Sequence, residues 1–471
     1  MPTVDVPFPT SSAPGMRPQE SGGRLVNCFA DKAPKGAPSD IIYRRSPGLR
    51  RLVSIGNNHT RGFLNAGTQA LWIKDDFVYQ VNDNFSVGNN GALAGTKPVT
   101  TAKNNAGTPG MVVVTENGCF KLSLSGIPVD IAEPGLPPGP TSVCDYNGYF
   151  VWSYPDGKIF ASNLNSFTVA SNSFAVEQGL FVRRVVRFAG RLFAFGDQWT
   201  GVYRDVGSVP FPFSREVTIP RGIIGTFAIA GWETGWANEL VWAGDDFIVY
   251  KLQGYTPIPV SNDSVSRDIA KSALDGVGGA IEASVYMYGR HAFWTLTSPG
   301  RWTWEYNITT GEWNERKSYL QSSWRGRQSL RIFNRFLIGD ATTNELYEIT
   351  GQYFKESNDP LIFSAESGVA AGFPEGMVIP RADFAITTGV GQVGIDSDPT
   401  VAISWSLDGG HNYGFPVHRN LGNEGETRSH PFILNCGLST GQGIRFLLEV
   451  ADPIHVGLSG GKINAVDAGP G

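Results

Sequence analysis

A pattern of two apolar strands joined by a polar turn recurs along the first three quarters of the chain. In Met111–Leu122, an apolar run is followed by Asn117 and Gly118, a pair typical of type I′ hairpin turns, and then by a second strand. Aromatic side chains are frequent in these strands, as expected on pleated, half-buried surfaces. Seven such hairpins begin near residues 70, 112, 149, 192, 240, 292 and 336. The pattern predicts a protein built mainly from antiparallel hairpins.

The hairpins are regularly spaced. Successive hairpins begin 37 to 52 residues apart, which is the length of one four-stranded β-propeller blade. One such sheet cannot bury both faces alone, whereas sheets stacked in a ring bury them against each other. We therefore expect an all-β fold with a β-propeller of about seven blades; six or eight blades, or a long β-sandwich, are the alternatives. Arg50–Ile55 is the candidate strand for closing the ring.

The same pattern divides the chain into three parts. Residues 1–48 are rich in Pro, Ser and Gly and predict an extended N-terminal arm, laid over its own domain or a neighbouring subunit. Residues 49–360 carry the propeller hairpins, with Ser264–Ala273 as the best candidate for a short helix. The period stops near residue 361, and residues 361–471 predict a small C-terminal antiparallel β-sandwich or barrel.

Composition agrees with short strands and limits the possible partners. Gly is abundant, with 58 residues, and charged residues make up only 17% of the chain, which suits many tight turns. The net charge of −5 argues against a general nucleic-acid binder, and residues 361–471 hold five Lys/Arg against eleven Asp/Glu. Four widely separated cysteines predict free thiols. The lack of a signal-peptide pattern or long apolar segment predicts a protein made in a cytoplasm and not inserted into a membrane.

Few residues are arranged as a catalytic or metal site requires. Asp75 and Asp76 are adjacent carboxylates, but they fall in a predicted hairpin turn, where Asp serves the backbone. His411, His418 and His430 are near each other in sequence without the regular spacing of metal ligands. We therefore predict no catalytic residues, no cofactor and no metal.

Two arginine-rich stretches are candidate contact surfaces. Their arginines could form ion pairs at blade edges and interfaces, or they could contact DNA phosphates, which require charge but no sequence readout. The candidate residues are Arg183, Arg184, Arg187, Arg325, Arg327 and Arg331.

One turn motif lies outside the repeats. Ser406, Asp408, Gly410 and Tyr413 have the spacing of the Asp-box, and the segment is similar to that element of sialidase-like proteins. In those families the box is a folding element, which implies a structural turn here. A single copy outside the hairpins does not favour a sialidase.

Three places in the chain resemble the packaged-DNA stabilisation proteins, also called tail hub or nozzle proteins, of short-tailed bacteriophages. Leu25–Asn27, followed by Arg45–Leu49, is similar to the N-terminal arm of that family. Trp405–Gly414 is similar to its turn, and Ile444–Gly460 resembles its final strands. The middle of the chain matches in character, as aromatic hairpins.

The resemblance implies a structural protein of the virion tail. Such proteins form a homo-oligomeric ring, typically of six copies, beneath the portal and its adaptor protein. The ring extends the channel for packaged double-stranded DNA, retains that DNA, and docks tail fibres, spikes or a needle. A β-propeller glycosidase or carbohydrate-binding protein with exposed Trp platforms is the first alternative, and a monomeric host scaffold is the second.

Overall fold

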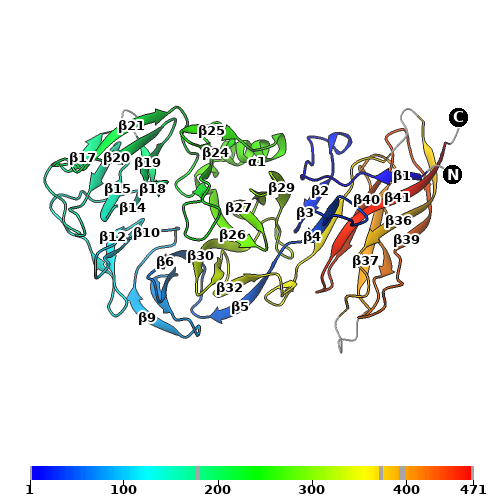
Figure 1. Cartoon of the computed structure of the whole chain (residues 1–471), viewed down its shortest axis with the longest axis horizontal. Coiled ribbons are helices and arrows are strands. Elements are labelled where there is room, and N and C mark those ends of the chain that lie inside the picture. Colours follow the sequence, from blue (N-terminus) through cyan, green and yellow to red (C-terminus); the bar gives the residue numbers. More distant parts are fainter. Residues whose placement is uncertain (1–2, 177–180, 371–374, 392–397, 468–471) are drawn as a thin grey trace.

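The computed structural model describes residues 3–176, 181–370, 375–391 and 398–467. Within them the chain is built almost entirely of β-strands, arranged as a ring of small sheets at one end and a two-layered sandwich at the other (Figure 1). The first and last strands, β1 (Thr3–Val6) and β41 (Gly457–Asp467), both lie in the sandwich (Figure 1). The all-β expectation is confirmed.

The ring consists of four-stranded antiparallel units, and the described residues hold seven of them. The first three units are β6 (Thr60–Asn65), β7 (Ala70–Lys74), β8 (Phe77–Val81) and β9 (Val87–Ala92); β10 (Thr100–Lys103), β11 (Met111–Thr115), β12 (Gly118–Leu122) and β13 (Val129–Asp130); and β14 (Ser142–Tyr146), β15 (Tyr149–Ser153), β16 (Lys158–Ala161) and β17 (Phe174–Val176). The fourth and fifth units are β18 (Val182–Phe188), β19 (Arg191–Gly196), β20 (Thr200–Asp205) and β21 (Phe213–Ile219), followed by β22 (Ile229–Ala230), β23 (Val241–Ala243), β24 (Val249–Gln253) and β25 (Thr256–Pro259). The sixth unit is β26 (Glu282–Tyr288), β27 (His291–Ser298), β28 (Trp302–Asn307) and β29 (Glu312–Glu315), and the seventh is β30 (Gly326–Ile332), β31 (Arg335–Asp340) and β32 (Glu345–Thr350) with β5 (Gly48–Ser54) from earlier in the chain.

The first strand of each unit lies toward the centre of the ring. Strands β6, β10, β14 and β18 contact one another in sequence, as do β22, β26 and β30. Strand β30 also contacts β6, so the last unit meets the first and the ring is closed (Figure 1). The central strands therefore carry the side chains that face the axis or the neighbouring unit.

An N-terminal strand completes the last unit. Strand β5 pairs antiparallel with β32, with Leu49 opposite Ile349 and Arg50 opposite Glu348. This is the closing strand predicted at Arg50–Ile55. Two short strands, β33 (Lys355–Glu356) and β34 (Asp359–Pro360), extend the same sheet beyond β5.

Large aromatic side chains fill the spaces between the units. Trp72, Trp152, Trp242 and Trp294 lie on the second strands of four units, and all are fully buried. The indole N–H of Trp72 donates to Thr60 Oγ1 at 2.9 Å, so the indole of Trp72 is buried without an unpaired donor. The aromatic hairpins of the sequence thus form the contacts between sheets.

The sandwich draws strands from both ends of the chain. One sheet contains β2 (Arg24–Val26), β35 (Phe363–Glu366), β40 (Arg445–Val450), β37 (Thr400–Ser406) and β38 (Val417–Asn420); the other contains β3 (Cys28–Lys32), β4 (Ile41–Arg45), β41 (Gly457–Asp467), β36 (Met377–Ile386) and β39 (Phe432–Leu438), with β1 (Thr3–Val6) against β41. Phe384 and Phe446 meet across the two sheets, with ring centroids 5.2 Å apart. Residues 1–48, expected as an extended arm, instead supply paired strands to this fold.

Helical structure is limited in the described residues. Helix α1 (Asp263–Leu274) matches the predicted short helix, and Asn262 caps it by accepting a hydrogen bond from the backbone N–H of Val265 at 3.0 Å. Two 3-10 turns, η1 (Pro18–Glu20) and η2 (Gly278–Ala280), complete the inventory.

Candidate interaction surfaces

The three predicted arginines near residue 185 lie on one central strand, β18, but their side chains have different surroundings. Arg183 forms an ion pair with Asp197 in the next hairpin. Arg187 donates to Asp145 Oδ2 at 2.6 Å and so joins β18 to the neighbouring central strand β14. Arg184 is buried. The strand therefore presents one cation to its own unit, one to the adjacent unit and one to the interior.

The second group lies on or beside the central strand β30. Arg327 makes a bidentate ion pair with Glu282 on β26, with distances of 2.8 and 2.5 Å. Arg331 donates to the backbone carbonyl of Gly235 at 2.8 Å. Arg325 contacts Asp340 at 3.5 Å and Asp359 at 3.0 Å. The contacts of Arg327 and Arg331 join separate units, whereas those of Arg325 stay within the sheet that contains β30.

The arginine stretches thus come together around the centre of the ring, but not as one basic patch. Arg187 and Arg327 each use a carboxylate from the preceding central strand as a partner. An arginine that is bonded to a carboxylate has little charge left for phosphate. The sequence could not reveal these partners, because they lie 42 and 45 residues away.

The predicted turn at the end of β37 is held by its own side chains. Ser406 donates to Asp408 Oδ1 at 2.6 Å, and the backbone N–H of Gly410 donates to Ser406 Oγ at 2.8 Å. Hydrogen bonds to its carboxylate lower the pKa of Asp408 to about 2, the one from Ser406 having the largest effect. Tyr413 donates to Glu366 Oε1 on β35 at 2.8 Å. The carboxylate is used to shape the turn.

Strands from the N-terminal segment connect the sandwich to the ring, a junction that the sequence did not predict. Val26 of β2 pairs in parallel with Glu315 of β29, so one sheet runs from the last-but-one unit into the sandwich. On β3, Asp31 accepts from Arg290 at 2.6 Å and contacts His291 at 3.1 Å. Burial raises the pKa of Asp31, but hydrogen bonds from Arg290 and Arg44 hold it below its ordinary value. No local motif marks the contact between Asp31 and the propeller, because Arg290 is 259 positions away in the sequence.

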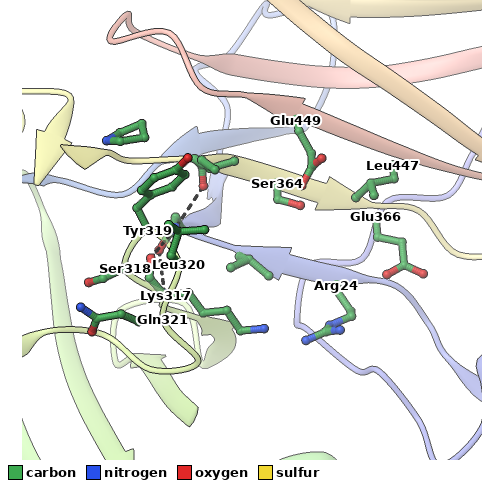
Figure 2. A pocket seen from close by; sticks show the side chains of 14 residues that line it. Arg24, Lys317, Ser318, Tyr319, Leu320, Gln321, Ser364, Glu366, Leu447 and Glu449 are labelled. Carbon is green, nitrogen blue, oxygen red and sulfur yellow. Dashed lines mark hydrogen bonds between the residues drawn. The ribbon is translucent and has the colours of Figure 1, made fainter. Parts of the chain in front are cut away.

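A pocket of about 330 Å³ lies at this junction (Figure 2). Strands β2, β35 and β40 form one wall, and the loop 317–321 forms the other (Figure 2). Asn27 holds the loop in place, donating to the carbonyls of Lys317 and Ile362 at 2.9 and 3.0 Å. The charged lining residues are Arg24, Lys317, Glu366 and Glu449. With two charges of each sign, the pocket has no net charge with which to select an ion.

The other groups with possible chemistry are scattered or buried within the described residues. Within the described ranges, no three His, Cys, Asp or Glu side chains gather as a metal site would require. Cys119 and Cys436 are free thiols, and burial raises the pKa of each to about 12. None of the twelve tryptophans, all of which are described, is exposed. Among the described helices, none has the length and apolarity needed to cross a bilayer.

Comparisons with known proteins support one family. The family model described as Bacteriophage P22 Gp10, beta-propeller, matches residues 25–353. No curated protein matches the chain.

Solved structures with similar folds are remote. They include the WD40 β-propeller domain of Doa1 (8% identity, TM-score 0.42, 64% of this chain and 96% of that one) and virginiamycin B lyase from Staphylococcus aureus (7%, 0.42, 66% and 98%). The computationally designed Ika8 protein also matches (11%, 0.38, 64% and 99%). With TM-scores below 0.5, these likenesses carry no functional argument.

Proposed function

The chain belongs to the bacteriophage P22 Gp10 β-propeller family of phage packaged-DNA stabilisation proteins, and from this membership we propose that it forms a ring in the virion tail. In the proposal, six copies assemble beneath the portal and its adaptor protein. The ring extends the DNA channel, retains the packaged DNA and docks tail fibres, spikes or a needle. The observation that carries the proposal is the family match over residues 25–353.

The sandwich offers a surface suited to contacts between copies. Val378 on β36 lies opposite Leu438 on β39 and Val466 on β41, and all three side chains are exposed. We call these residues the outer apolar row. Contiguous exposed apolar side chains are typical of interaction sites. A closed ring needs head-to-tail contacts between different surfaces of neighbouring copies, and the outer apolar row could form one side of such a contact.

The arginines are better explained as contacts within the propeller than as DNA contacts. Five of the six bond to a described carboxylate or carbonyl, most of them in another unit. Such pairs hold the units of the propeller together and so favour a rigid subunit for the proposed ring of copies. This arrangement supports the interface role expected for these residues.

The carbohydrate alternative depended on exposed Trp platforms. Sugar-binding sites use an aromatic face that a ligand can reach, whereas here every Trp is buried or half-buried. No observation in the described residues favours that alternative over a structural role.

Native mass spectrometry of the purified chain, alone and with the phage portal-adaptor protein, tests the proposal. We expect a closed ring of six copies, and we expect Val378→Lys with Leu438→Lys to shift it to monomers without lowering the melting temperature. Leu274→Lys, which changes an exposed apolar residue on α1, is the matched control and should leave the ring intact. A wild-type chain that stays monomeric with the adaptor present would refute the proposal.

A further inference from the structure

Arg184 differs from the other arginines at the centre of the ring. Its side chain is buried, and its Nε and Nη1 atoms have no hydrogen-bond partner among the described residues. An unpaired charge removed from water is costly, so such groups normally have a partner of opposite charge or a ligand. Arg184 therefore calls for a physical explanation beyond packing.

Two aromatic rings hold the guanidinium in a fixed position. The centre of the guanidinium lies 5.6 Å from the ring centroid of Phe227 and 5.2 Å from that of Trp232, both within the range of cation–π attraction. These contacts offset part of the desolvation cost but satisfy none of the N–H groups. A guanidinium held by aromatic contacts keeps its N–H groups available for an anion, which it can bind with two parallel hydrogen bonds.

A small cavity lies beside this guanidinium. Its volume is about 60 Å³, and its lining includes Thr101, Cys144, Asp145, Arg184, Arg187 and Trp232. One water requires only about 10–15 Å³ of such space, so the cavity has room for a small tetrahedral oxyanion. The lining comes from the central strands β10, β14 and β18 and from the segment after β22, so the cavity lies between units.

The charges around the cavity leave Arg184 as the cation without a close counter-ion. Asp145 is already bonded to Arg187 at 2.6 Å. Burial raises the pKa of the Cys144 thiol well above its usual range, so this group adds no negative charge. Glu233 is the other nearby acid; burial raises its pKa to about 7, and its Oε2 accepts from the backbone N–H of Gly231 at 2.6 Å. At neutral pH Glu233 compensates Arg184 only in part.

From this geometry we propose that the cavity binds one oxyanion, a free phosphate or a phosphate of a nucleic-acid backbone, through Arg184. The ligand would lie between the second, third, fourth and fifth units of the propeller, whose residues line the cavity. It would thereby fix the relative positions of these sheets. The site does not depend on the assembly of several copies into a tail ring, because all of its residues belong to one chain.

Calorimetric titration of the full-length protein with inorganic phosphate, at constant ionic strength, tests the proposal. We expect saturable binding that Arg184→Gln weakens at least tenfold. Arg183→Gln is the matched control, because Arg183 lies on the same strand but pairs with Asp197. This variant should leave the affinity for phosphate unchanged. No saturable binding by the wild type, or equal affinity of Arg184→Gln and wild type, would overturn the proposal.

A second experiment needs no variant and so does not depend on the folding of Arg184→Gln. In wild-type crystals soaked in tungstate, we expect an anomalous peak within hydrogen-bond distance of Arg184 Nε or Nη1, and peaks found only elsewhere would contradict the site. Competition with a short DNA duplex then separates the two sources. A duplex that displaces phosphate identifies backbone phosphate, whereas one that does not identifies a free anion.

Discussion

At the residue scale, the contribution of an arginine ion pair to the free energy of unfolding depends on how deeply the pair is buried. The side chains of Arg327 and Glu282 are only 14% and 10% exposed, whereas those of Arg187 and Asp145 are 52% and 25% exposed. Removing one member of a buried pair leaves the other charge unpaired, while exposed pairs contribute little. Both ion pairs join an arginine to a carboxylate on the preceding central strand. They differ in solvent access and in geometry, since Arg327 makes two hydrogen bonds to its partner and Arg187 makes one.

We therefore expect Arg327→Ser to lower the free energy of unfolding by roughly 3 kcal/mol. The control Arg187→Ser should lower it by about 1 kcal/mol or less. Chemical unfolding followed by Trp fluorescence measures both. Exchanging the partners, with Arg327→Glu and Glu282→Arg together, should recover part of the loss; equal losses for the two single variants would contradict the argument.

The sequence predicts where such arginines lie but not what each one does. Arg183, Arg184 and Arg187 lie within five positions of one strand, yet their surroundings differ. Arg183 pairs with a carboxylate of its own unit, and Arg187 pairs with one of the adjacent unit. Arg184 has no described hydrogen-bond partner for its Nε and Nη1 atoms. The alternation of a strand separates adjacent side chains onto opposite faces. What each face meets is set by neighbouring units, so it becomes visible only in the folded chain.

At the element scale, the ring is closed by a strand from a different part of the chain. Strands β5 and β32 are joined by pairs such as Ser54 with Glu345, whose residues are 291 positions apart. Every other four-stranded unit of the described ring is continuous in sequence. Separating β5 from β32 is therefore the way to open the ring without disrupting a local hairpin.

We expect a disulfide made by Ser54→Cys with Glu345→Cys to slow unfolding markedly. The control is Lys121→Cys with Val129→Cys, which joins β12 and β13 within one unit and closes only a short loop. Unfolding rates in denaturant, with and without reductant, measure the effect. If the disulfide between positions 54 and 345 forms but slows unfolding no more than the control, separation of β5 from β32 is not the rate-limiting step of unfolding.

The hairpins were predictable because their signal is local. The second strands of the units begin at residues 70, 111, 149, 191, 241, 291 and 335, close to the expected positions. First and fourth strands were harder to predict, since β13 and β22 have only two residues each. Strands of that length contain no alternation to detect, and they form because an adjacent strand is available for pairing.

At the scale of the whole molecule, the sandwich is assembled from both ends of the chain. Strand β1 pairs with β41, where Thr3 lies opposite Asn464, and Tyr43 of β4 lies opposite Leu458. The sequence predicted an arm because residues 1–48 are rich in Pro and Gly and their strands are short. Pairing over more than 400 residues leaves no local pattern. The predicted C-terminal unit is therefore completed by the N-terminal segment.

A chain that begins at Gly48 tests this dependence directly, because it retains the closing strand β5 but lacks β1 to β4. We expect the propeller to remain protease-resistant while residues 363–467 become sensitive. The sandwich would lose the buried side chains of Leu25, Cys28 and Tyr43, and a fully buried large apolar side chain contributes about 1.5–3 kcal/mol. Limited proteolysis with mass spectrometry measures the change in each region.

The matched control is a chain that begins at Phe8, which removes only β1. It should keep the sandwich folded, with faster hydrogen exchange confined to Gly461–Asn464, the part of β41 that β1 covers. If residues 363–467 are protected equally in both shortened chains, the C-terminal strands fold without the N-terminal segment. If the propeller also becomes sensitive when the chain begins at Gly48, the junction through Asp31 and Glu315 stabilises the ring as well as the sandwich.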